Sequence, residues 1–497
     1  MKRSGDGGAS AGPFWGPGRF LLVLALLVTV VASLVVLRAR MQGLGRFAQA
    51  AAVLEIVQEQ YVRETDPDEL SRAAISGMLS QLGDPNSVYI PPAVAEQFNR
   101  VVMGQDYVGI GIQVQRRDGF VTVTTPMAGT PAARAGVLPG DRIVAVDGVD
   151  TRELDTDEVT GLIAGPRGGA VALTVERDGE AVTLEIVRGE IRAESVKGLR
   201  RLDAEGAWWH GLDVDRGIGY IRISQFVGGT AVATLEAIER AREQMGGLHG
   251  LVLDLRHNPG GSIGESVGVA ELFIDGGPVV RTENRAGESV TLEAMPGMVF
   301  DGPIVVLIDA VSASGSEIVA GALVERLENA RALGTRTFGK ASVQTVYGLP
   351  DGGTLKLTEA HYLLPSGRNL QREAGSSAWG VDPSEGMHVT LGEGGWQAIG
   401  ALMERLDAVG AADAGGIDPS AWESPEALLA AMGDAQLAAA HEAIVGMFKT
   451  GQWPRVGGDP IAGEAALRIE QLERAIERME AERARMLDEV RTLREAS

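Results

Sequence analysis

The sequence predicts an α/β core, built on a parallel-rich sheet with crossover helices, within residues 190–392. Short apolar strands and segments with helical spacing alternate there, at residues 218–223, 230–244, 251–255, 264–274, 304–308 and 317–327. A strand, a helix and a second strand in this order imply a right-handed parallel crossover. The other segments are assigned around this core.

Residues 105–188 predict a β-rich domain inserted ahead of the core. Short strands and glycine-rich turns alternate there, and the run from Ala133 to Ile143 ends in the pattern Gly-x-x-x-Gly-Asp-Arg-Ile. With this run, the segment resembles a PDZ domain, whereas a lone Gly-x-Gly would be typical of a plain β-turn. In a PDZ domain, glycine amides converge on a peptide's terminal carboxylate and the next strand offers a free edge. The resemblance implies that substrate C-termini are bound by Gly109, Ile110, Gly111 and Ile112.

The composition excludes several classes of protein. The formal net charge of −22 over 497 residues argues against a nucleic-acid partner, because phosphate binding needs clustered Lys and Arg. The chain has no cysteine, which excludes a thiol nucleophile and a disulfide. Its six histidines are scattered without HExxH spacing, so we expect neither a metal site nor a cofactor.

An uninterrupted apolar run at residues 20–37 is just long enough to cross a bilayer as a helix. We assign it as a transmembrane anchor that follows a cytoplasmic N-terminus at residues 1–19. A cleaved signal peptide is the alternative, because Ala48-Gln49-Ala50 has the small-x-small form of a cleavage site, although it lies well beyond the run. Basic residues flank the run on both sides, so charge does not settle the orientation.

The remaining segments have helical character. Residues 44–104 predict two short helices that are broken near Pro67. Residues 393–463 contain three helical pieces, at 397–406, 425–432 and 437–447. Residues 464–497 carry a 3-4 apolar spacing that predicts a coiled coil and hence self-association into a homo-oligomer. A single amphipathic helix packed on the protein is the alternative.

The stretch at residues 308–318 offers a candidate nucleophile, because an apolar strand ends there in small hydroxyl residues before a helical pattern resumes. A serine at such a turn lies near a helix N-terminus, where unpaired amides stabilise negative charge. From local sequence alone, Ser312, Ser314 and Ser316 are equally well interpreted as helix caps. Lys340, one of only five lysines, favours the catalytic interpretation, because a desolvated lysine can act as a base and arginine cannot. A solvated lysine at a strand end is the alternative.

Ser262 is a second candidate nucleophile. It lies in a Gly-x-Ser-x-Gly pattern between a strand and a helix, as a nucleophile elbow would. That role needs a histidine base, and only His361 and His388 are available, with nothing nearby that marks either one. In the alternative interpretation, the glycines after the strand bring backbone amides to a reacting carbonyl oxygen and form half of an oxyanion hole.

Three runs together resemble the signatures of the carboxyl-terminal processing peptidases, a serine–lysine protease family. They begin at Asp254 (Asp-Leu-Arg-His-Asn-Pro-Gly-Gly), at Ser312 (Ser-Ala-Ser-Gly-Ser-Glu-Ile-Val-Ala-Gly) and at Thr337 (Thr-Phe-Gly-Lys-Ala-Ser-Val-Gln). The similarity extends over roughly residues 53–389 and includes the embedded PDZ domain. It implies a serine endopeptidase that acts on proteins or peptides through their C-termini.

The resemblance also implies roles for individual residues. Ser314 takes the position of the nucleophile, Lys340 that of the base, and Gln344 that of the residue that orients the lysine. Gln344 lies an even number of residues beyond Lys340, which predicts that both share one strand face. Ser312 and Ser316 are then turn and cap residues. The oxyanion hole would use backbone amides of Gly260 or Gly261 and of Gly315.

Two departures from the family pattern bear on this assignment. Position 315 is Gly where the family usually has Ala, which keeps the N–H and loosens the turn. The spacing from Ser314 to Lys340 is one residue longer than usual, and we expect the loop at residues 328–333 to absorb the insertion. A shifted strand register would instead turn Lys340 away.

The expected location is the inner membrane, spanned once, with the protease domain in the periplasm or otherwise outside the cytoplasm. The alternative function is a catalytically inactive adaptor that keeps its PDZ domain on a protease scaffold. The presence of both Ser314 and Lys340 favours the enzyme.

Overall fold

The computed structural model describes residues 47–459, except 93, 96, 97, 99–106, 118, 128, 139, 178, 192–193, 203–206, 374–375, 393 and 408–415. The expected anchor at residues 20–37 and the expected coiled coil at 464–497 lie outside the described residues. Among the helices that the structure does describe, none is both long and apolar enough to cross a membrane. The chain divides into two compact units, residues 1–89 and 90–497.

The first unit contains the two helices expected near its end. One covers residues 47–60, and the other is α2 (Pro67–Ser80). Asp66 separates them by capping α2, where its side chain accepts from the amide of Asp68 at 2.8 Å and proline occupies the first turn. The expected break near Pro67 is therefore a helix start. Strand β1 (Val88–Ile90) follows.

The β-rich domain consists mainly of short strands, as predicted, and two short helices complete its described elements. They are β2 (Tyr107–Gly109), β3 (Ile112–Arg117), β4 (Phe120–Pro126), α4 (Pro131–Arg134), β5 (Arg142–Val146), β6 (Val149–Asp150), α5 (Thr156–Ile163), β7 (Ala170–Arg177), β8 (Glu180–Val187) and β9 (Gly189–Ile191). The main sheet is antiparallel in the order β3-β4-β5-β7-β8, with β6 paired to β5, and β2 pairs separately with β9. Within the described residues, β3 is therefore an edge strand.

The predicted parallel sheet forms the centre of the second unit. Its elements are β10 (Val196–Lys197), β13 (Gly211–Asp213), β14 (Ile218–Ile223), α6 (Thr230–Met245), β15 (Gly250–Asp254), α7 (Ile263–Glu271), β18 (Ile304–Ile308), α8 (Gly315–Arg326) and β19 (Ala330–Gly334). Strands β14, β15, β18 and β19 are parallel neighbours in that order, whereas β10 and β13 pair antiparallel with β14. A short hairpin of β11 (Arg200–Arg201) and β12 (Trp208–Trp209) lies between β10 and β13 in the chain.

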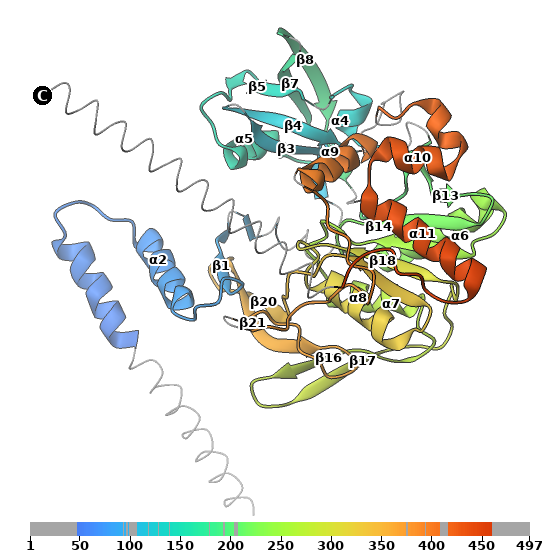
Figure 1. Cartoon of the computed structure of the whole chain (residues 1–497). Coiled ribbons are helices and arrows are strands. Elements are labelled where there is room, and N and C mark those ends of the chain that lie inside the picture. The colour runs from blue at the N-terminus through green and yellow to red at the C-terminus, as the bar shows by residue number, and fades with distance from the viewer. Residues whose placement is uncertain are drawn as a thin grey trace, which may run out of the picture. The chain divides into compact units, whose positions relative to one another are not determined.

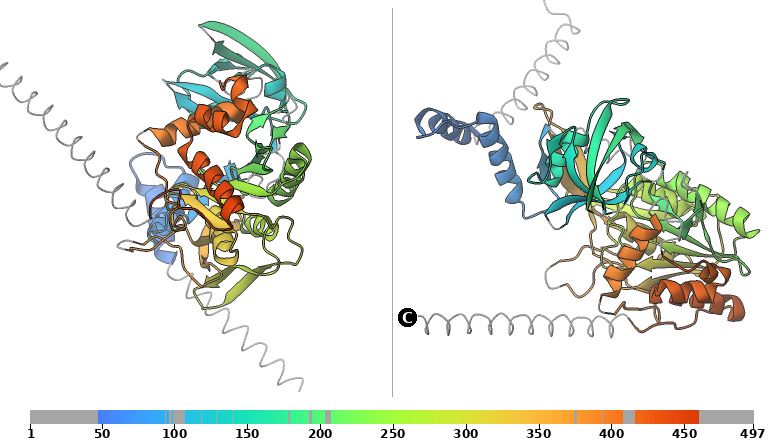
Figure 2. Two further views of the ribbon diagram at one scale, coloured as in Figure 1. Left: turned by 45° about the vertical axis from the view of Figure 1, so that its right-hand side comes forward. Right: turned by 90° about the horizontal axis from the view of Figure 1, so that it is seen from above.

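Helices cover both faces of this sheet (Figures 1 and 2). Along β18, Ile304, Val306 and Ile308 pack into one core together with α6, α7 and α8. Val305 and Leu307 point the other way, into a second core with the C-terminal helices. The two-residue period of the strand thus divides one continuous apolar run between two layers of helices, which is why the run shows no alternation in sequence.

The C-terminal helices occur where the sequence predicts them. They are α9 (Gly395–Asp407), α10 (Pro425–Met432) and α11 (Ala435–Thr450), with a short 3-10 turn at Pro419–Glu423. Leu437, Ala440 and Ile444 of α11 are buried against the sheet. The C-terminal helices are therefore part of the core packing.

Two expectations about the strands near Lys340 were wrong. The segment at residues 328–333, expected as a loop, mostly forms β19, so the connection after α8 is very short. Lys340, expected to share a strand with Gln344, lies in a loop instead, because the strand begins only at β20 (Ser342–Gly348). Strand β20 pairs with β21 (Thr354–Leu363), which pairs with β16 (Gly277–Asn284), which in turn pairs with β17 (Ser289–Ala294).

Candidate active site

The candidate site lies at the carboxyl ends of β15 and β18. These strands are parallel neighbours, so the loops that follow them meet at one edge of the sheet. Asn258 in the first loop joins them, because its carbonyl oxygen accepts from the amide of Ala313 at 3.1 Å and from the hydroxyl of Ser316 at 2.9 Å. The sheet thereby brings the predicted oxyanion loop to the predicted nucleophile.

Ser314 occupies a strained turn at the start of α8. Its backbone has φ 54° and ψ −112°, a conformation that L-residues rarely adopt. Such strain persists only where the surroundings impose it, and it is concentrated at functional sites. The side chain is half-buried at a helix N-terminus, where backbone dipoles favour negative charge.

Glu317 holds this turn in place. The carboxylate is completely buried, and it accepts from the amide of Ser314 at 2.8 Å and from the amide of Lys340 at 2.9 Å through the same oxygen. Its other oxygen accepts from the Thr337 hydroxyl at 2.6 Å and the Gly339 amide at 2.7 Å. Burial raises the pKa of Glu317 above its usual value, and these donors oppose the rise. One carboxylate thus fixes both segments that carry the predicted dyad.

Tyr362 adds a second link between the same segments. Its hydroxyl donates to the carbonyl oxygen of Ser314 at 3.1 Å and also to that of Lys340. Burial, together with the nearby Glu317 carboxylate, raises the pKa of Tyr362 well above its usual value, so the hydroxyl remains a donor.

Sequence reasoning missed the roles of both residues. Glu317 entered only as one position of the run that begins at Ser312, and Tyr362 was assigned no role. The sequence did contain one indication of the role of Glu317. An acidic residue at the start of an apolar helix is expected to be buried, and a buried carboxylate needs hydrogen-bond donors.

The predicted relation between Gln344 and Lys340 assumed that both residues lie on one continuous strand. The amide nitrogen of Gln344 donates to the hydroxyls of Ser342 at 2.9 Å and Thr358 at 3.2 Å. Lys340 precedes the strand, and the pairing register shifts between Val343 and Gln344. The argument that an even spacing puts Gln344 and Lys340 on one face was therefore wrong, and the orienting role of Gln344 stays a prediction.

The three glycines of the predicted oxyanion hole are packed against one another. A Cβ atom on Gly260 would lie 2.7 Å from Cβ of Ser314, and one on Gly261 would lie 2.1 Å from the carbonyl oxygen of Phe226. The Gly260 amide is already used, since it donates to Oδ1 of Asn258 at 2.8 Å. Within the described residues, the amides of Gly261 and Gly315 donate to no acceptor.

The packing explains why position 315 is glycine. A Cβ atom there would lie 2.3 Å from the hydroxyl oxygen of Ser266 and 3.0 Å from the ring of Phe226. Real Cβ atoms do not approach neighbours so closely, so an alanine would require these side chains to move. In this chain, the glycine at position 315, where the family usually has alanine, is therefore packed against the side chain of Ser266.

Ser262, the rival nucleophile, is a helix cap. Its hydroxyl accepts from the amide of Glu265 at 3.3 Å at the start of α7, and its backbone has an ordinary φ of −64°. His361, one of the two bases considered, lies exposed on β21. Ser262 therefore matches the Gly-x-Ser-x-Gly pattern but serves as a helix cap.

The neighbouring serines differ from expectation in one respect. Ser312 is a turn residue, as predicted, since its hydroxyl donates to the carbonyl oxygen of Leu255 at 2.8 Å and accepts from the amide of Asp309. Ser316 is not the cap of α8. The cap position belongs to Ser314, and the Ser316 hydroxyl instead ties the helix to Asn258.

The predicted carboxylate-binding loop connects β2 to β3. Ile110 is buried, and its carbonyl oxygen accepts from the amide of Ala132 at 2.8 Å. Gly111 has φ +81°, and a Cβ atom there would lie 2.4 Å from Thr130. The loop is thus held by α4 and leads directly into the edge strand β3, beside which α5 packs.

Comparison with known families defines the class of protein. A model described as peptidase family S41 matches residues 217–385, a PDZ domain model matches 122–177, and a model described as the activating protease CtpB N-terminal domain matches 36–92. With the serine turn of the α/β core inside the first match, the chain is a serine-type peptidase.

Individual relatives narrow the class to a family. The chain is 34% identical to a probable CtpA-like serine protease of Staphylococcus aureus strain MSSA476 over 357 residues, covering 70% of this chain and 68% of the relative. It is 32% identical to the carboxy-terminal processing protease CtpA of Bacillus subtilis over 352 residues, covering 70% and 72%. The chain belongs to the carboxyl-terminal processing peptidases. Among solved structures, a photosystem II D1 C-terminal processing protease matches at 27% identity, with TM-score 0.40 and coverage of 72% and 91%.

Proposed function

We propose that this peptidase hydrolyses peptide bonds with a dyad of Ser314 and Lys340. The supporting observation is the single Glu317 oxygen that accepts from the backbone amides of both residues, because it holds their two segments side by side. Lys340 is half-buried, and a lysine acts as a base only as the neutral amine, a form that arginine cannot reach.

The proposed reaction proceeds in two stages. Neutral Lys340 accepts the hydroxyl proton of Ser314 as the Ser314 oxygen bonds to the scissile carbonyl carbon. The tetrahedral intermediate then loses its amine, which takes the proton from the Lys340 ammonium as the C–N bond breaks. Water then bonds to the acyl carbon and gives a proton to the neutral lysine. The acyl C–O bond breaks, the carboxylic acid leaves, and the lysine ammonium returns the proton to the Ser314 oxygen.

The developing oxyanion would be bound by the amides of Gly261 and Gly315. Both amides are without acceptors among the described residues, and a Cβ atom on Gly315 would lie 3.5 Å from the Gly261 nitrogen, so the two amides are neighbours. The Gly260 amide is less suited, because it is bonded to Asn258. Preorganised donors of this kind typically lower a barrier by about 3–4 kcal/mol each.

Lysine and arginine substitutions test the dyad. Lys340→Arg keeps the positive charge but cannot deprotonate, so we expect turnover of an unfolded, fluorescein-labelled casein to fall by about 10³-fold or more. Lys356→Arg is the matched control, since Lys356 is also a half-buried lysine and is predicted to keep wild-type turnover. Wild-type turnover by Lys340→Arg would contradict the dyad. If neither the wild type nor any variant cleaves the substrate while the PDZ domain still binds C-terminal peptides, the inactive adaptor is favoured instead.

The PDZ domain would select substrates by their C-termini. Its loop at Gly109, Ile110, Gly111 and Ile112 leads into β3, whose outer edge pairs with no other strand among the described residues and would suit strand addition. Amidating the C-terminus of a peptide substrate removes the carboxylate, and we expect its KM to rise about tenfold at unchanged kcat. An unchanged KM would exclude carboxylate recognition.

The location and assembly of the protein rest on its terminal sequences. We propose a single-pass inner-membrane protein that is anchored by residues 20–37, with its protease domain in the periplasm or otherwise extracytoplasmic, and that associates through residues 464–497. Removing residues 464–497 should reduce the mass measured by light scattering to that of a monomer. An unchanged mass would point to the single amphipathic helix instead.

A further inference from the structure

Arg256 is a fully buried arginine directly before the loop that carries Gly260 and Gly261. Its side chain is 1% exposed. A guanidinium is always charged and has five N–H donors, so burial demands a carboxylate partner and several acceptors. The residues that supply these acceptors are therefore candidates for holding the loop in its conformation.

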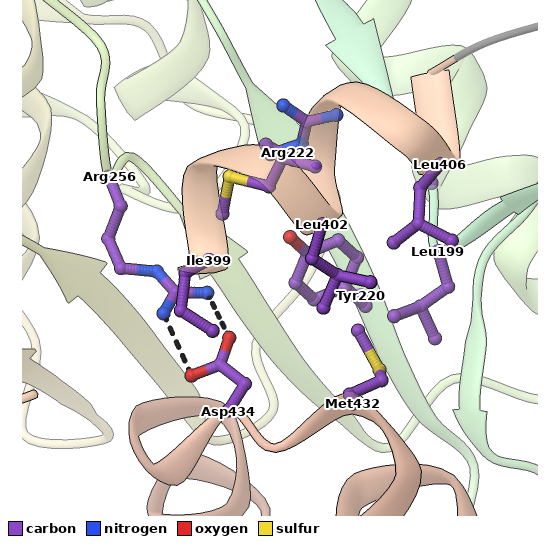
Figure 3. Close-up of a pocket in the computed structure, with 11 residues that line it drawn as sticks. Leu199, Tyr220, Arg222, Arg256, Ile399, Leu402, Leu406, Met432 and Asp434 are labelled. Carbon is purple, nitrogen blue, oxygen red and sulfur yellow. Dashed lines mark hydrogen bonds and ion pairs between the residues drawn. The ribbon is translucent and has the colours of Figure 1, made fainter. Parts of the chain in front are cut away.

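All five donors of Arg256 have an acceptor. Nε and Nη2 donate to Asp254 at 3.0 and 2.7 Å, and the remaining Nη2 hydrogen goes to Asp434 at 2.7 Å. Nη1 donates to Asp434 at 3.0 Å and to the side-chain oxygen of Gln436 at 3.1 Å. The guanidinium therefore forms bidentate pairs with two carboxylates, and Figure 3 shows the pair with Asp434.

Asp434 and Gln436 come from the C-terminal helices, far from Arg256 in sequence. Asp434 caps α11, where Oδ1 also accepts from the amides of Gln436 at 3.1 Å and Leu437 at 3.0 Å. The Gln436 side chain donates to the carbonyl oxygen of Val389 at 2.8 Å. Because α11 is packed into the second core, Asp434 cannot shift independently of that helix.

The loop beyond Arg256 needs such a support. His257 has φ +58°, which is unusual for an L-residue, and its amide donates to Asp309 at 3.0 Å. Its ring contacts Trp396 at the start of α9, with centroids 4.6 Å apart. Strained backbone persists only when its neighbours over-determine it, and here the C-terminal helices provide contacts at two successive residues.

A purely stabilising role is a weaker explanation of the Arg256 cluster. Buried ion pairs are often no more stabilising than apolar residues of similar volume, because both charges must lose their water. Two carboxylates on one guanidinium increase that desolvation cost further. What the cluster uniquely provides is a fixed direction for the chain as it leaves β15.

We infer that Asp434 is a positioning residue of the active site: through Arg256 it holds the loop at 257–261 in the conformation that presents the Gly261 amide to the oxyanion. The inference rests on the proposed function of that amide. It also makes the C-terminal helices part of the catalytic unit.

Asp434→Asn tests this role in the full chain, because the amide keeps the shape and the helix cap but turns one acceptor into a donor facing the guanidinium. For the unfolded casein substrate, we expect kcat per folded molecule to fall about 10- to 100-fold, with KM within about threefold. The matched control is Asp418→Asn, an exposed cap in the same region that accepts from Ser420 and contacts no arginine. The control should keep wild-type kcat.

Hydrogen exchange of the loop separates this inference from the proposed function. In Asp434→Asn, the hydrogen-bonded amides of His257, Asn258 and Gly260 should exchange about tenfold faster while β15 stays protected. Unchanged loop exchange, or wild-type kcat in the folded variant, would overturn the role of Asp434. Wild-type turnover by Ser314→Ala would instead overturn the proposed function, and the exchange result would still decide the anchoring.

A milder variant covers the case in which Asp434→Asn fails to fold. Gln436→Met removes one acceptor and leaves both carboxylate pairs in place. We expect a smaller loss of kcat, about 3- to 10-fold, and faster exchange of the same loop. Wild-type values for both measurements would also overturn the inference.

Discussion

Two turns in this molecule share one local sequence pattern and have different structures. Ser262 and Ser314 each follow a parallel strand, each begin a helix, and each are followed three residues later by a glutamate, Glu265 or Glu317. This S-x-x-E pattern is the capping box of a helix start. Ser262 adopts an ordinary backbone with φ −64°, whereas Ser314 has φ 54° and ψ −112°.

The two glutamates account for the difference. Glu265 turns away from its own turn and accepts from the amides of Gly229 at 3.0 Å and Ala231 at 2.9 Å, so it ties α7 to the start of α6. Glu317 accepts from its own cap residue and from the segment that carries Lys340. The comparison teaches that one capping pattern can take two backbone conformations, according to the partners of its glutamate.

The largest effect should separate the two serines. Ser314→Ala removes the proposed nucleophile, so cleavage of the casein substrate should fall by roughly 10⁴-fold or more. Ser262→Ala should keep turnover within about threefold, since that hydroxyl only caps a helix. A steady-state assay on both variants measures the ratio. The reverse ranking would show that the rival elbow is catalytic.

Substitutions of the two glutamates should give a smaller difference in kcat than substitutions of the two serines. Glu317→Gln leaves buried amides facing an NH₂ group, so both catalytic segments lose a fixed partner and kcat should fall about 10²-fold. Glu265→Gln is the matched control at the same helix position and should keep kcat within about threefold. Steady-state kinetics on the folded variants checks this, and equal losses would mean that Glu317 acts only in stability.

Substitutions at position 315, directly after Ser314, test how tightly the Ser314 turn is packed. Gly315→Ala brings a Cβ atom against the Ser266 hydroxyl, and we expect the free energy of unfolding to drop by about 1–3 kcal/mol. Adding Ser266→Ala should restore part of that loss, with Ser266→Ala alone as the control. Urea denaturation followed by circular dichroism gives the values. Additive effects of the two substitutions would contradict the proposed collision.

The smallest effect concerns the cap itself. Ser262→Ala should lower the free energy of unfolding by about 1 kcal/mol, because the Glu265 amide loses its acceptor. Ser424→Ala offers a comparison, since Ser424 caps α10 in the same way with a 3.2 Å bond to the Ala427 amide. Chemical denaturation of both variants should give similar losses, and a much larger loss for Ser262→Ala would indicate a role beyond capping.

The sequence by itself determined the class of fold and the order of the central strands and helices, although it missed β19 and the loop at Lys340. Apolar periodicity placed β14, β18 and α10 at their observed bounds, because side-chain spacing is a local property of strands and helices. The family resemblance supplied Ser314 and Lys340 as the predicted dyad. Both outcomes depend on short runs of neighbouring residues.

Only the tertiary structure decided which groups meet. The partners of Glu317, the occupied amide of Gly260, and the clamp of Asp434 on Arg256 join segments that are distant in sequence. The parity argument for Gln344 failed for the same reason, since a strand boundary and a register shift intervene. Donors and acceptors at the end of a parallel sheet are brought together by the pairing of strands, and local sequence carries no record of that pairing.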